Sequence, residues 1–444
     1  MRLDEVSSVV VGDGPNALQG AITSKTPSEL TFIVVVRHGS PIGPQTVKVM
    51  SQFGSATFAE AVFISPITAA PTGSDSFQMN SDLTGTDERP LRSFTRAMKL
   101  AAAGDTVLLK NGTYDAAHGE TFPETSTSWN VPDGVMLMGE SRGATIVQGP
   151  KGDCDTADAF VLAGSASIET ITIAGFCNNG ISTLKGVVTI RDVTIVDTTV
   201  GVNVETSTVL DSVDISGANI AISNFASTGT LAVTNSRVHG NRLGIDAPFA
   251  DAALVVTASE IDHNCPGPAN REDDGSIVVK GPAALTDVNI HHNLCPGVTT
   301  TPTGLTGQLA ISRGVFALNE FAAIKFRGPG RAKVRESSFG PHPAAIYLAS
   351  TASIDLGTPE DPGNNGFSVC DKCDAIFDAR PAPTHGSNPT TVKGISWNRG
   401  GAPLSVPTGC FDADEPKGRT SPPRLWHIEH PGSCASATGN IILN

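Results

Sequence analysis

The chain has 444 residues, enough for about three average domains or fewer large ones. Only 17% of the residues are charged and 5% are aromatic, whereas glycine (46 residues) and proline (30 residues) are frequent. This composition disfavours long charged helices and favours a β-rich chain with many turns. The formal net charge of −14 argues against a nucleic-acid partner, because nucleic-acid-binding proteins carry clustered Lys and Arg. The sequence contains no run of about 18 apolar residues, so no transmembrane helix is predicted.

Residues 1–66 alternate short apolar runs with turn residues, which predicts the short strands of an antiparallel β-sandwich. Three segments resemble the second half of an IPT/TIG immunoglobulin-like domain: TPSELTFIV (26–34), GPQTVKV (43–49) and GSATF (54–58). The opening strands of that family have no counterpart, so we expect a partial sandwich. The first residues do not form a signal peptide, so either the protein is intracellular or its native N-terminus is absent. The truncated resemblance favours the second alternative. Residues 67–82, rich in Ser, Thr and Gly, are predicted to be a linker.

A helix is predicted next, because apolar residues between Leu91 and Ala101 fall on one helical face. Pro90 stands near its start and Gly104 follows its end, as helix punctuation requires. The apolar run 106–109 then predicts a strand.

Residues 168–339 repeat one pattern, in which an apolar anchor is followed by a second apolar residue five positions later. In a continuous strand, residues an odd number of positions apart point to opposite faces. Two inward-facing residues five positions apart therefore require a turn of the chain between them. Units of about 22 residues with such corners predict the coils of a β-solenoid, whose stacking completes the core. The pairs are Ile168/Ile173, Ile190/Ile195, Leu210/Ile215, Val233/Val238, Val256/Ile261, Leu285/Ile290, Ile311/Phe316 and Val334/Phe339.

Polar residues also recur at fixed places in these coils. Asparagine stands eight residues after the anchor at Asn241, Asn264, Asn293 and Asn319. Stacked asparagines pair along a solenoid and tolerate left-handed backbone, so we predict a structural ladder. One position or two before this ladder lie His239, His263, His291 and His292. Stacked imidazoles could hold a transition metal, but we predict structural hydrogen bonds and no metal here.

Several motifs lie between residues 83 and 367: PLRSFT (90–95), GDTV (104–107), GTY (112–114), GETFP (119–123), PDGV (132–135), GATI (143–146), DLGT (355–358) and PGNN (362–365). With these motifs, the segment resembles a pectin-lyase-like right-handed parallel β-helix domain of unknown function from bacterial surface proteins. The resemblance implies an all-β domain over residues 83–367, capped by the first helix and exposed at the cell surface or secreted. It implies no established reaction. We predict that residues 368–444, rich in Pro and Gly, form a C-terminal capping extension.

Eight cysteines indicate an oxidising compartment if they pair. The spacing suggests Cys154–Cys177, Cys265–Cys295, Cys370–Cys373 and Cys410–Cys434, with reduced buried thiols as the alternative. Cys370 and Cys373 could also join His427 and His430 in a zinc site, but a structural disulfide is expected.

The candidate site is a basic cluster in an otherwise acidic chain. By the repeat register, Ile324 and Phe326 point inward and Lys325 and Arg327 outward. Lys or Tyr on such a face could act as base or acid towards an acidic sugar, and Arg could neutralise its carboxylate. The alternative is a solvated face with cross-strand charge pairs. The predicted catalytic residues are Lys325, Arg327, Tyr347 and Asp246, and the predicted substrate-binding residues are Lys333, Arg335, Arg331 and Asn203.

Two functions follow from this sequence. The first is an extracellular or cell-surface scaffold or adhesin that engages a polysaccharide or cell-envelope polymer without catalysis and without a cofactor. The second is a polysaccharide lyase or hydrolase acting on an acidic glycan, for which calcium would be expected if it were a lyase. The absence of galacturonan-hydrolase motifs and the scarcity of Trp (3) and Tyr (2) favour the first.

Overall fold

The computed structural model describes residues 2–14, 17–34, 36, 40, 42–76, 85–120, 128–150, 158–266, 275–357, 361, 363–368, 374–379, 395–399, 402–403 and 424–428. The chain divides into two compact units, which are described separately. Unit 1 is Met1–Phe122, Asn130–Val147 and Gly164–Ile171, and unit 2 is Pro123–Trp129, Gln148–Ala163 and Thr172–Asn444. Within the described residues, no helix is long and apolar enough to cross a membrane.

Unit 1 begins with a five-stranded antiparallel sheet in the order β3-β2-β1-β4-β5. Its buried cluster includes Val6, Val9, Val47 and Val49 on the central strands. The described strands form one sheet where a partial sandwich was predicted, because alternating apolar residues define a buried face but not how many sheets share it. The IPT/TIG resemblance stays a prediction. A short 3₁₀ turn (Leu3–Glu5) precedes β1 (Val6–Val11), β2 (Leu18–Lys25), β3 (Leu30–Val34), β4 (Gly43–Ser51) and β5 (Gly54–Ile64).

The predicted helix is present in unit 1 as α1 (Phe94–Leu100), with Ser93 as its N-cap. Strand β6 (Ile67–Ala69) pairs with β7 (Thr106–Leu109), so a strand occupies the start of the range predicted to be a linker. The other elements of the first coils are β8 (Gly112–Tyr114), a 3₁₀ turn (Ala116–His118), β10 (Met136–Gly139) and β13 (Ser167–Glu169). Three strands contain residues of both units: β9 (Trp129–Val131), β11 (Thr145–Gln148) and β12 (Phe160–Gly164).

A buried carboxylate secures the start of α1. The carboxylate of Glu120 accepts hydrogen bonds from the Phe94 backbone nitrogen at 2.7 Å and from Thr95 Oγ1 at 2.9 Å. Burial raises the pKa of Glu120 to about 7 in spite of these bonds. Its place at the helix N-terminus gives this group a capping role.

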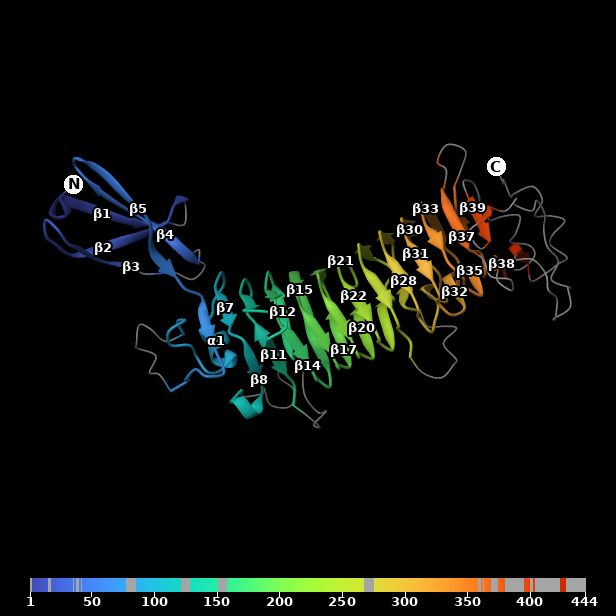
Figure 1. The fold of residues 1–444 in the computed structure, drawn as a ribbon, viewed down its shortest axis with the longest axis horizontal. Helices are drawn as coiled ribbons and strands as arrows, with labels where there is room; N and C mark the ends of the chain where they lie inside the picture. Colours follow the sequence, from blue (N-terminus) through green and yellow to red (C-terminus); the bar gives the residue numbers. More distant parts are fainter. Residues whose placement is uncertain are drawn as a thin grey trace. The chain divides into compact units, whose positions relative to one another are not determined.

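Unit 2 is a right-handed parallel β-helix, whose strands stack side by side in Figure 1. Each coil contributes one strand to each of three parallel sheets, and the long strand β15 (Asn179–Arg191) runs through a corner from the third sheet into the first. The first sheet continues with β18 (Ser207–Asp211), β21 (Gly229–Thr234), β24 (Ala252–Thr257), β27 (Ala283–Thr286), β30 (Gln308–Ser312), β33 (Arg331–Arg335) and β36 (Ser353–Asp355). The second sheet contains β14 (Thr172–Ala174), β16 (Thr194–Val196), β19 (Asp214–Ser216), β22 (Arg237–His239), β25 (Glu260–Asp262), β28 (Asn289–His291), β31 (Val315–Ala317), β34 (Ser338–Phe339) and β37 (Asn365–Ser368). The third sheet contains β17 (Val200–Val204), β20 (Ile220–Asn224), β23 (Leu243–Ala247), β26 (Ile277–Val279), β29 (Val298–Thr300), β32 (Ala322–Lys325) and β35 (Ala344–Leu348).

The five-residue offset is explained by the corner between the first and second sheets. Each anchor lies buried in the first sheet and its partner lies buried in the second, as Ile190 and Ile195 do. Two residues after the anchor, the backbone turns through the left-handed region, for example at Asp192 with φ 50°. The same conformation recurs at this corner in the coils that follow: Ser212, Asn235, Ala258, Asp287, Arg313 and Glu336.

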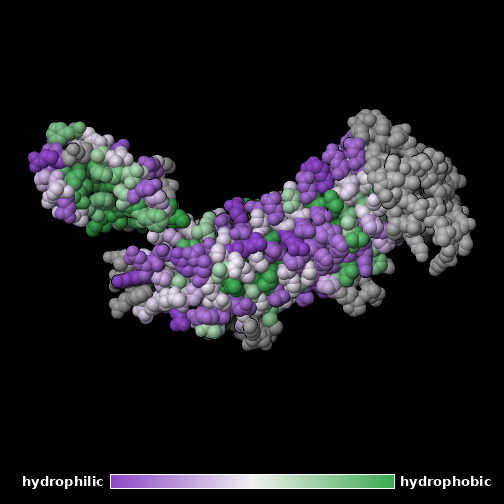
Figure 2. All heavy atoms as spheres, in the orientation of Figure 1, coloured by the Kyte–Doolittle hydropathy of each residue, from purple (hydrophilic) through white to green (hydrophobic). Residues whose placement is uncertain are grey.

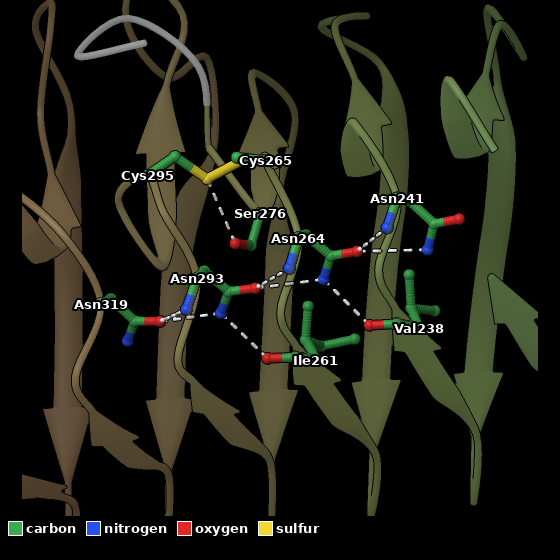
Figure 3. The surroundings of a disulfide bond; sticks show 9 residues. All are labelled: Val238, Asn241, Ile261, Asn264, Cys265, Ser276, Asn293, Cys295 and Asn319. Carbon is green, nitrogen blue, oxygen red and sulfur yellow. Dashed lines mark hydrogen bonds between the residues drawn. A yellow bond between two sulfur atoms is a disulfide. The ribbon is translucent and has the colours of Figure 1, made fainter. Parts of the chain in front are cut away.

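The corner between the second and third sheets holds the predicted asparagine ladder (Figure 3). Nδ2 of each asparagine donates to Oδ1 of the next, at 3.1 Å from Asn241 to Asn264, 3.1 Å from Asn264 to Asn293 and 2.7 Å from Asn293 to Asn319. All four side chains are buried, and each Nδ2 also donates to a backbone carbonyl of the preceding coil. Buried amides are stable only when they are hydrogen-bonded in this way, so the structural role is confirmed.

One predicted disulfide is confirmed beside this ladder. Cys265 and Cys295 are bonded, with a Cα–Cα distance of 5.9 Å, and join two neighbouring coils (Figure 3). Cys177 is also disulfide-bonded, whereas its predicted partner Cys154 lies outside the described residues. The predictions for Cys370, Cys373, Cys410 and Cys434, and the zinc alternative with His427 and His430, likewise concern side chains that are not described.

The strands described after residue 368 continue the stack. Strand β38 (Asp374–Asp378) pairs with β35 in the third sheet and is followed there by β41 (Arg424–Ile428). Strand β39 (Ile395–Arg399) pairs with β37 in the second sheet and also with β40 (Ala402–Pro403). The predicted capping extension therefore contributes further coil strands in its described part.

Candidate functional site

A pocket opens on the outer side of the third sheet, in the coils that contain β32, β35 and β38. It encloses about 310 Å³, and we call it the aromatic pocket. On the face drawn in Figure 2, the β-helix surface is mostly hydrophilic, with hydrophobic residues in small separate areas. The lining of the pocket combines mostly apolar residues with one cation. Its lining is Phe321, Ala322, Lys325, Pro343, Ala344, Tyr347 and Phe377.

Three side chains in register form the floor of the aromatic pocket. Lys325, Tyr347 and Phe377 are direct neighbours on adjacent strands. The rings of Tyr347 and Phe377 are stacked, with centroids 5.2 Å apart and planes at 11°. The Nζ atom of Lys325 lies 5.4 Å from the centroid of the Tyr347 ring, within the range of a cation–π contact. The site thus combines a flat aromatic surface with a positive charge.

The backbone at the pocket rim is unusual. Phe321 has a φ of 67°, a left-handed conformation that is an outlier for a bulky residue. Its carbonyl accepts a hydrogen bond from the Ala344 nitrogen of the next coil at 3.1 Å. This contact holds Phe321 at the pocket although the conformation is costly.

The predicted inward and outward positions are confirmed around Lys325. Ile324 and Phe326 are completely buried, and Lys325 and Arg327 are partly exposed. The Arg327 backbone nitrogen donates to Thr300 Oγ1 at 3.1 Å. Arg327 is not part of the lining of the aromatic pocket.

Asp246 and Asn203 lie in the predicted column but not beside Lys325. The register of the third sheet runs from Asn203 through Ser223 and Asp246, and three strand steps separate Asp246 from Lys325. At about 4.8 Å per strand these steps amount to roughly 14 Å. The predicted catalytic quartet is therefore not gathered at one point; Lys325 and Tyr347 are.

The predicted substrate-binding residues on β33 lie on the first sheet. Arg335 Nη2 contacts Asp355 Oδ2 at 2.8 Å and Asp361 Oδ2 at 2.9 Å, and Lys333 Nζ contacts Asp361 Oδ2 at 2.7 Å. Hydrogen bonds from Arg335 and then Lys333 hold the pKa of Asp361 well below its ordinary value. Arg331, on the same strand, is exposed. This face matches the alternative of cross-strand charge pairs.

The predicted histidine column includes a compact group that we call the histidine corner, consisting of His263, His291 and His292. His263 Nδ1 lies 2.6 Å from Asp262 Oδ2, and His291 Nε2 lies 2.8 Å from Glu260 Oε1. His291 Nδ1 lies 2.8 Å from His292 Nδ1. The predicted structural hydrogen bonds are present.

Asp262, which supports His263, has no exposed side-chain surface. Arg237 Nε and Nη2 donate to its two oxygens at 3.0 and 2.8 Å. Burial would raise the pKa of Asp262, but the hydrogen bonds from Arg237 and His263 lower it overall. Outside this group, His239 Nε2 lies 3.0 Å from Asp214 Oδ1.

The aromatic pocket does not fit calcium. Calcium takes six to eight oxygen ligands, mostly carboxylates and carbonyls, and no carboxylate belongs to the described lining. No step of chemistry through calcium follows from these residues.

The family model described as "Protein of unknown function (DUF1565)" matches residues 78–300, about half of the chain. The chain belongs to this family. The match covers the first coils of the β-helix and extends to β29, so the aromatic pocket of this DUF1565 member lies beyond it. No curated protein matches the chain.

Three solved structures are similar to this DUF1565 member. The A-module of mannuronan C-5 epimerase AlgE4 from Azotobacter vinelandii is 13% identical, with coverage of 76% of this chain and 91% of that chain and a TM-score of 0.39. A DFA-IIIase from Arthrobacter chlorophenolicus A6 is 14% identical, with coverage of 75% and 94% and a TM-score of 0.43. Pectate lyase Pel9A is 14% identical, with coverage of 77% and 82% and a TM-score of 0.30.

The sequence did not reveal Phe321, Pro343 and Phe377 as part of the site. The predicted anchor pairs end at Phe339, so the register was not extended to Phe377. The sequence signal that could have found Phe377 is its inward neighbour. Ile376 precedes Phe377 as Ile346 precedes Tyr347, and the two isoleucines pair in the structure. Loops of unequal length between the coils hide this spacing.

Proposed function

We propose that the chain is a secreted or cell-surface β-helix that binds an acidic polysaccharide at the aromatic pocket without cleaving it. The location rests on the bond between Cys265 and Cys295, because disulfides persist in oxidising compartments. The scaffold or adhesin role follows from the stacked coils, which offer a long, regular support for one binding face.

One observation carries the ligand class: Lys325 stands over the ring of Tyr347, which stacks on Phe377. The flat aromatic pair offers apolar surface for the C–H face of a sugar ring. The ammonium group of Lys325 would then pair with a carboxylate of the same or the next sugar. The chain has few aromatic residues, but two of their rings meet at this one place.

A lyase or hydrolase is less well supported by this geometry. Glycosidases place two carboxyl groups across the scissile bond, and the described lining of the pocket contains none. Lys325 and Tyr347 could supply a base or an acid, but Asp246 is roughly 14 Å away along the sheet. We therefore propose that the chain binds the polysaccharide without cleaving it. The test below would also detect cleavage.

The test is the binding of polyuronates, sulfated glycans and neutral glycans, measured by titration calorimetry. Tyr347→Ala should weaken polyuronate binding by about tenfold, because one ring of the stacked pair is lost. Phe225→Ala is the matched control, since Phe225 is 51% exposed, contacts Phe249 edge-on and does not line the aromatic pocket. The control should bind as the unchanged protein does.

Ultraviolet absorbance and reducing ends are followed in the same samples. New absorbance or new ends that disappear in Lys325→Ala would show an enzyme and overturn the scaffold proposal. Equal affinities of Tyr347→Ala and Phe225→Ala would remove the aromatic pocket as the binding site.

A further inference from the structure

We infer that the aromatic pocket binds the terminal sugar of an acidic glycan chain and not a segment within the chain. The inference rests on the proposed function, because it concerns the same pocket and names the part of the polymer that the pocket selects. The feature that carries it is a wall of protein beside Lys325, where the outer face of the third sheet is covered.

The outer face of the third sheet is covered at the residue next to Lys325. Thr299 on β29 is the direct neighbour of Lys325 in the register, so both side chains lie on the outer face. Thr299 nevertheless has an exposed fraction of 0%, whereas Lys325 and Tyr347 are partly exposed. A ligand that rests on Lys325 and Tyr347 therefore cannot continue along the sheet over Thr299.

Gly275 supplies the described part of this cover. A Cβ atom added to Gly275 would lie 2.8 Å from both Cβ and Oγ1 of Thr299. Two carbon atoms in ordinary contact are about 3.5–4.0 Å apart, so only glycine fits at this close approach. Gly275 is itself buried. The chain that leads into β26 therefore lies directly on the Thr299 side chain and forms an end wall of the aromatic pocket.

The end wall is held in place by the residue that follows Gly275. The Ser276 backbone nitrogen donates to the Pro296 carbonyl of the next coil at 2.9 Å. Ser276 Oγ lies 3.4 Å from Cys295 Sγ, beside the disulfide (Figure 3). Ser276 has an exposed fraction of 0%. Because these contacts tie the wall to the neighbouring coil, it can set a fixed boundary for a ligand.

A second wall stands at the corner between the second and third sheets. Phe321 and Pro343 line the pocket and come directly before the first residues of β32 and β35. Further along these two strands, the described lining ends at Lys325 and Tyr347. The pocket is thus bounded by walls on two adjacent sides, and a ligand enters from the other two.

Two adjacent walls favour the end of a glycan chain over its middle. A segment within a polymer continues in both directions, so it would have to enter by one open side and leave by the adjacent one. Linked sugar rings form a stiff chain, which does not turn through a right angle within one sugar. A terminal sugar needs to enter only once. The pocket volume of about 310 Å³ lies at the lower end of the range of ligand pockets, about 300–1,000 Å³, and suits a short ligand segment.

The test titrates the full chain, by calorimetry, with fragments of polygalacturonate and of alginate: a disaccharide, an octasaccharide and the long polymer. Binding of the chain end predicts one protein per glycan chain at every length. The dissociation constant per glycan chain should then change by less than about twofold from the octasaccharide to the polymer. Binding within the chain predicts instead several proteins per polymer and an affinity per chain that rises with the number of sites.

Octasaccharides with one altered end show which end is bound. Borohydride reduction opens the ring at the reducing end, and cleavage by a lyase leaves a double bond in the ring at the other end. One of these changes should weaken binding by more than about tenfold, because the altered ring no longer fits the pocket. Tyr347→Ala should weaken binding of the unaltered octasaccharide, whereas Phe225→Ala, outside the pocket, should not. Circular dichroism confirms that both variants are folded.

The outcomes separate this inference from the proposed function. Several proteins per polymer chain, with binding lost only in Tyr347→Ala, would overturn the inference and leave polysaccharide binding at the pocket intact. Equal affinities for the unaltered octasaccharide and for both altered ones would do the same. If the unchanged protein bound neither polygalacturonate nor alginate at any length, the proposed function would fail and the inference with it.

Discussion

The two basic segments of the β-helix, Lys325 on β32 and Lys333 with Arg335 on β33, differ in the partners that the fold gives them. Lys325 lies on the third sheet, beside the stacked rings of Tyr347 and Phe377. Lys333 and Arg335 lie on the first sheet, within 2.9 Å of the carboxylate of Asp361. The two lysines are eight positions apart in the chain, and a corner places them on different faces.

The difference shows that the neighbour across the stack decides what a cation can do. A carboxylate neighbour satisfies the charge and leaves little for a ligand. An aromatic neighbour attracts the cation through its ring face and adds apolar surface beside the charge. Within the same charge cluster, the first-sheet face thus holds charge pairs, and the third-sheet face is the one for which we propose binding.

The largest expected effect is on stability, in Arg335→Met. Arg335 donates to Asp355 and Asp361, and its side chain is only 12% exposed. Its loss should lower the free energy of unfolding by about 1–2 kcal/mol, because two carboxylates lose a charged donor that is partly shielded from solvent. The measurement is urea unfolding followed by circular dichroism.

Arg331→Met is the control on the same strand and should change the free energy of unfolding by less than about 0.5 kcal/mol. Polyuronate affinity should be unchanged in both variants. A loss of affinity in Arg335→Met without a loss of stability would reverse the assignment of the two faces.

A smaller effect is expected on binding, in the comparison of Lys325→Met with Lys333→Met. Removing the Lys325 charge should weaken polyuronate binding by about fivefold, which corresponds to about 1 kcal/mol for an exposed pair. Lys333→Met should change the affinity by less than about twofold, since Lys333 already faces Asp361. Calorimetric titration with the same polyuronate decides between them, and a larger loss in Lys333→Met would move the site to the first sheet.

The smallest effect is a dependence of stability on pH that involves Asp361. Its pKa is lowered in the folded chain by Arg335 and then Lys333. A carboxyl group whose pKa is lowered on folding stabilises the fold at pH values above its unfolded pKa of about 3.9. This stabilisation is lost as the pH falls below that value towards the pKa of the folded state. The urea midpoint of the unchanged protein should therefore exceed that of Asp361→Asn at neutral pH, and the two should converge below about pH 4. Parallel curves down to pH 2 would contradict the role of the ion pair.

Much of the fold could be predicted from the sequence, because coil stacking repeats the same local requirements. The anchor pair Ile190/Ile195 and its successors marked the corner, since only a turn explains an odd offset between two buried residues. The asparagines from Asn241 to Asn319 marked a second corner, because buried amides need partners in the next coil. Cys265 and Cys295 follow that corner in consecutive coils, and their pairing was predicted correctly.

The candidate site could be predicted only in part. Lys325 and Tyr347 are neighbours as the register indicated, whereas Asp246 belongs to the same column three coils away, as the anchors from Val233 to Ile311 already implied. Phe377 was missed because the segment from Tyr347 to Phe377 is longer than the segment from Lys325 to Tyr347, and the repeat no longer gave the register. Asp361 was missed for the same reason, although it neutralises two residues that the sequence marked as substrate-binding.

The sequence by itself therefore determined the β-helix, its corners and the direction in which Lys325 points. Each of these features is set by contacts between a residue and the equivalent residue in the next coil. Such contacts can be read from the sequence wherever the repeat is regular. Only the tertiary structure decided which cation meets an aromatic ring and which meets a carboxylate. Those partners come from segments of irregular length, and their position depends on how each loop returns the chain to the stack.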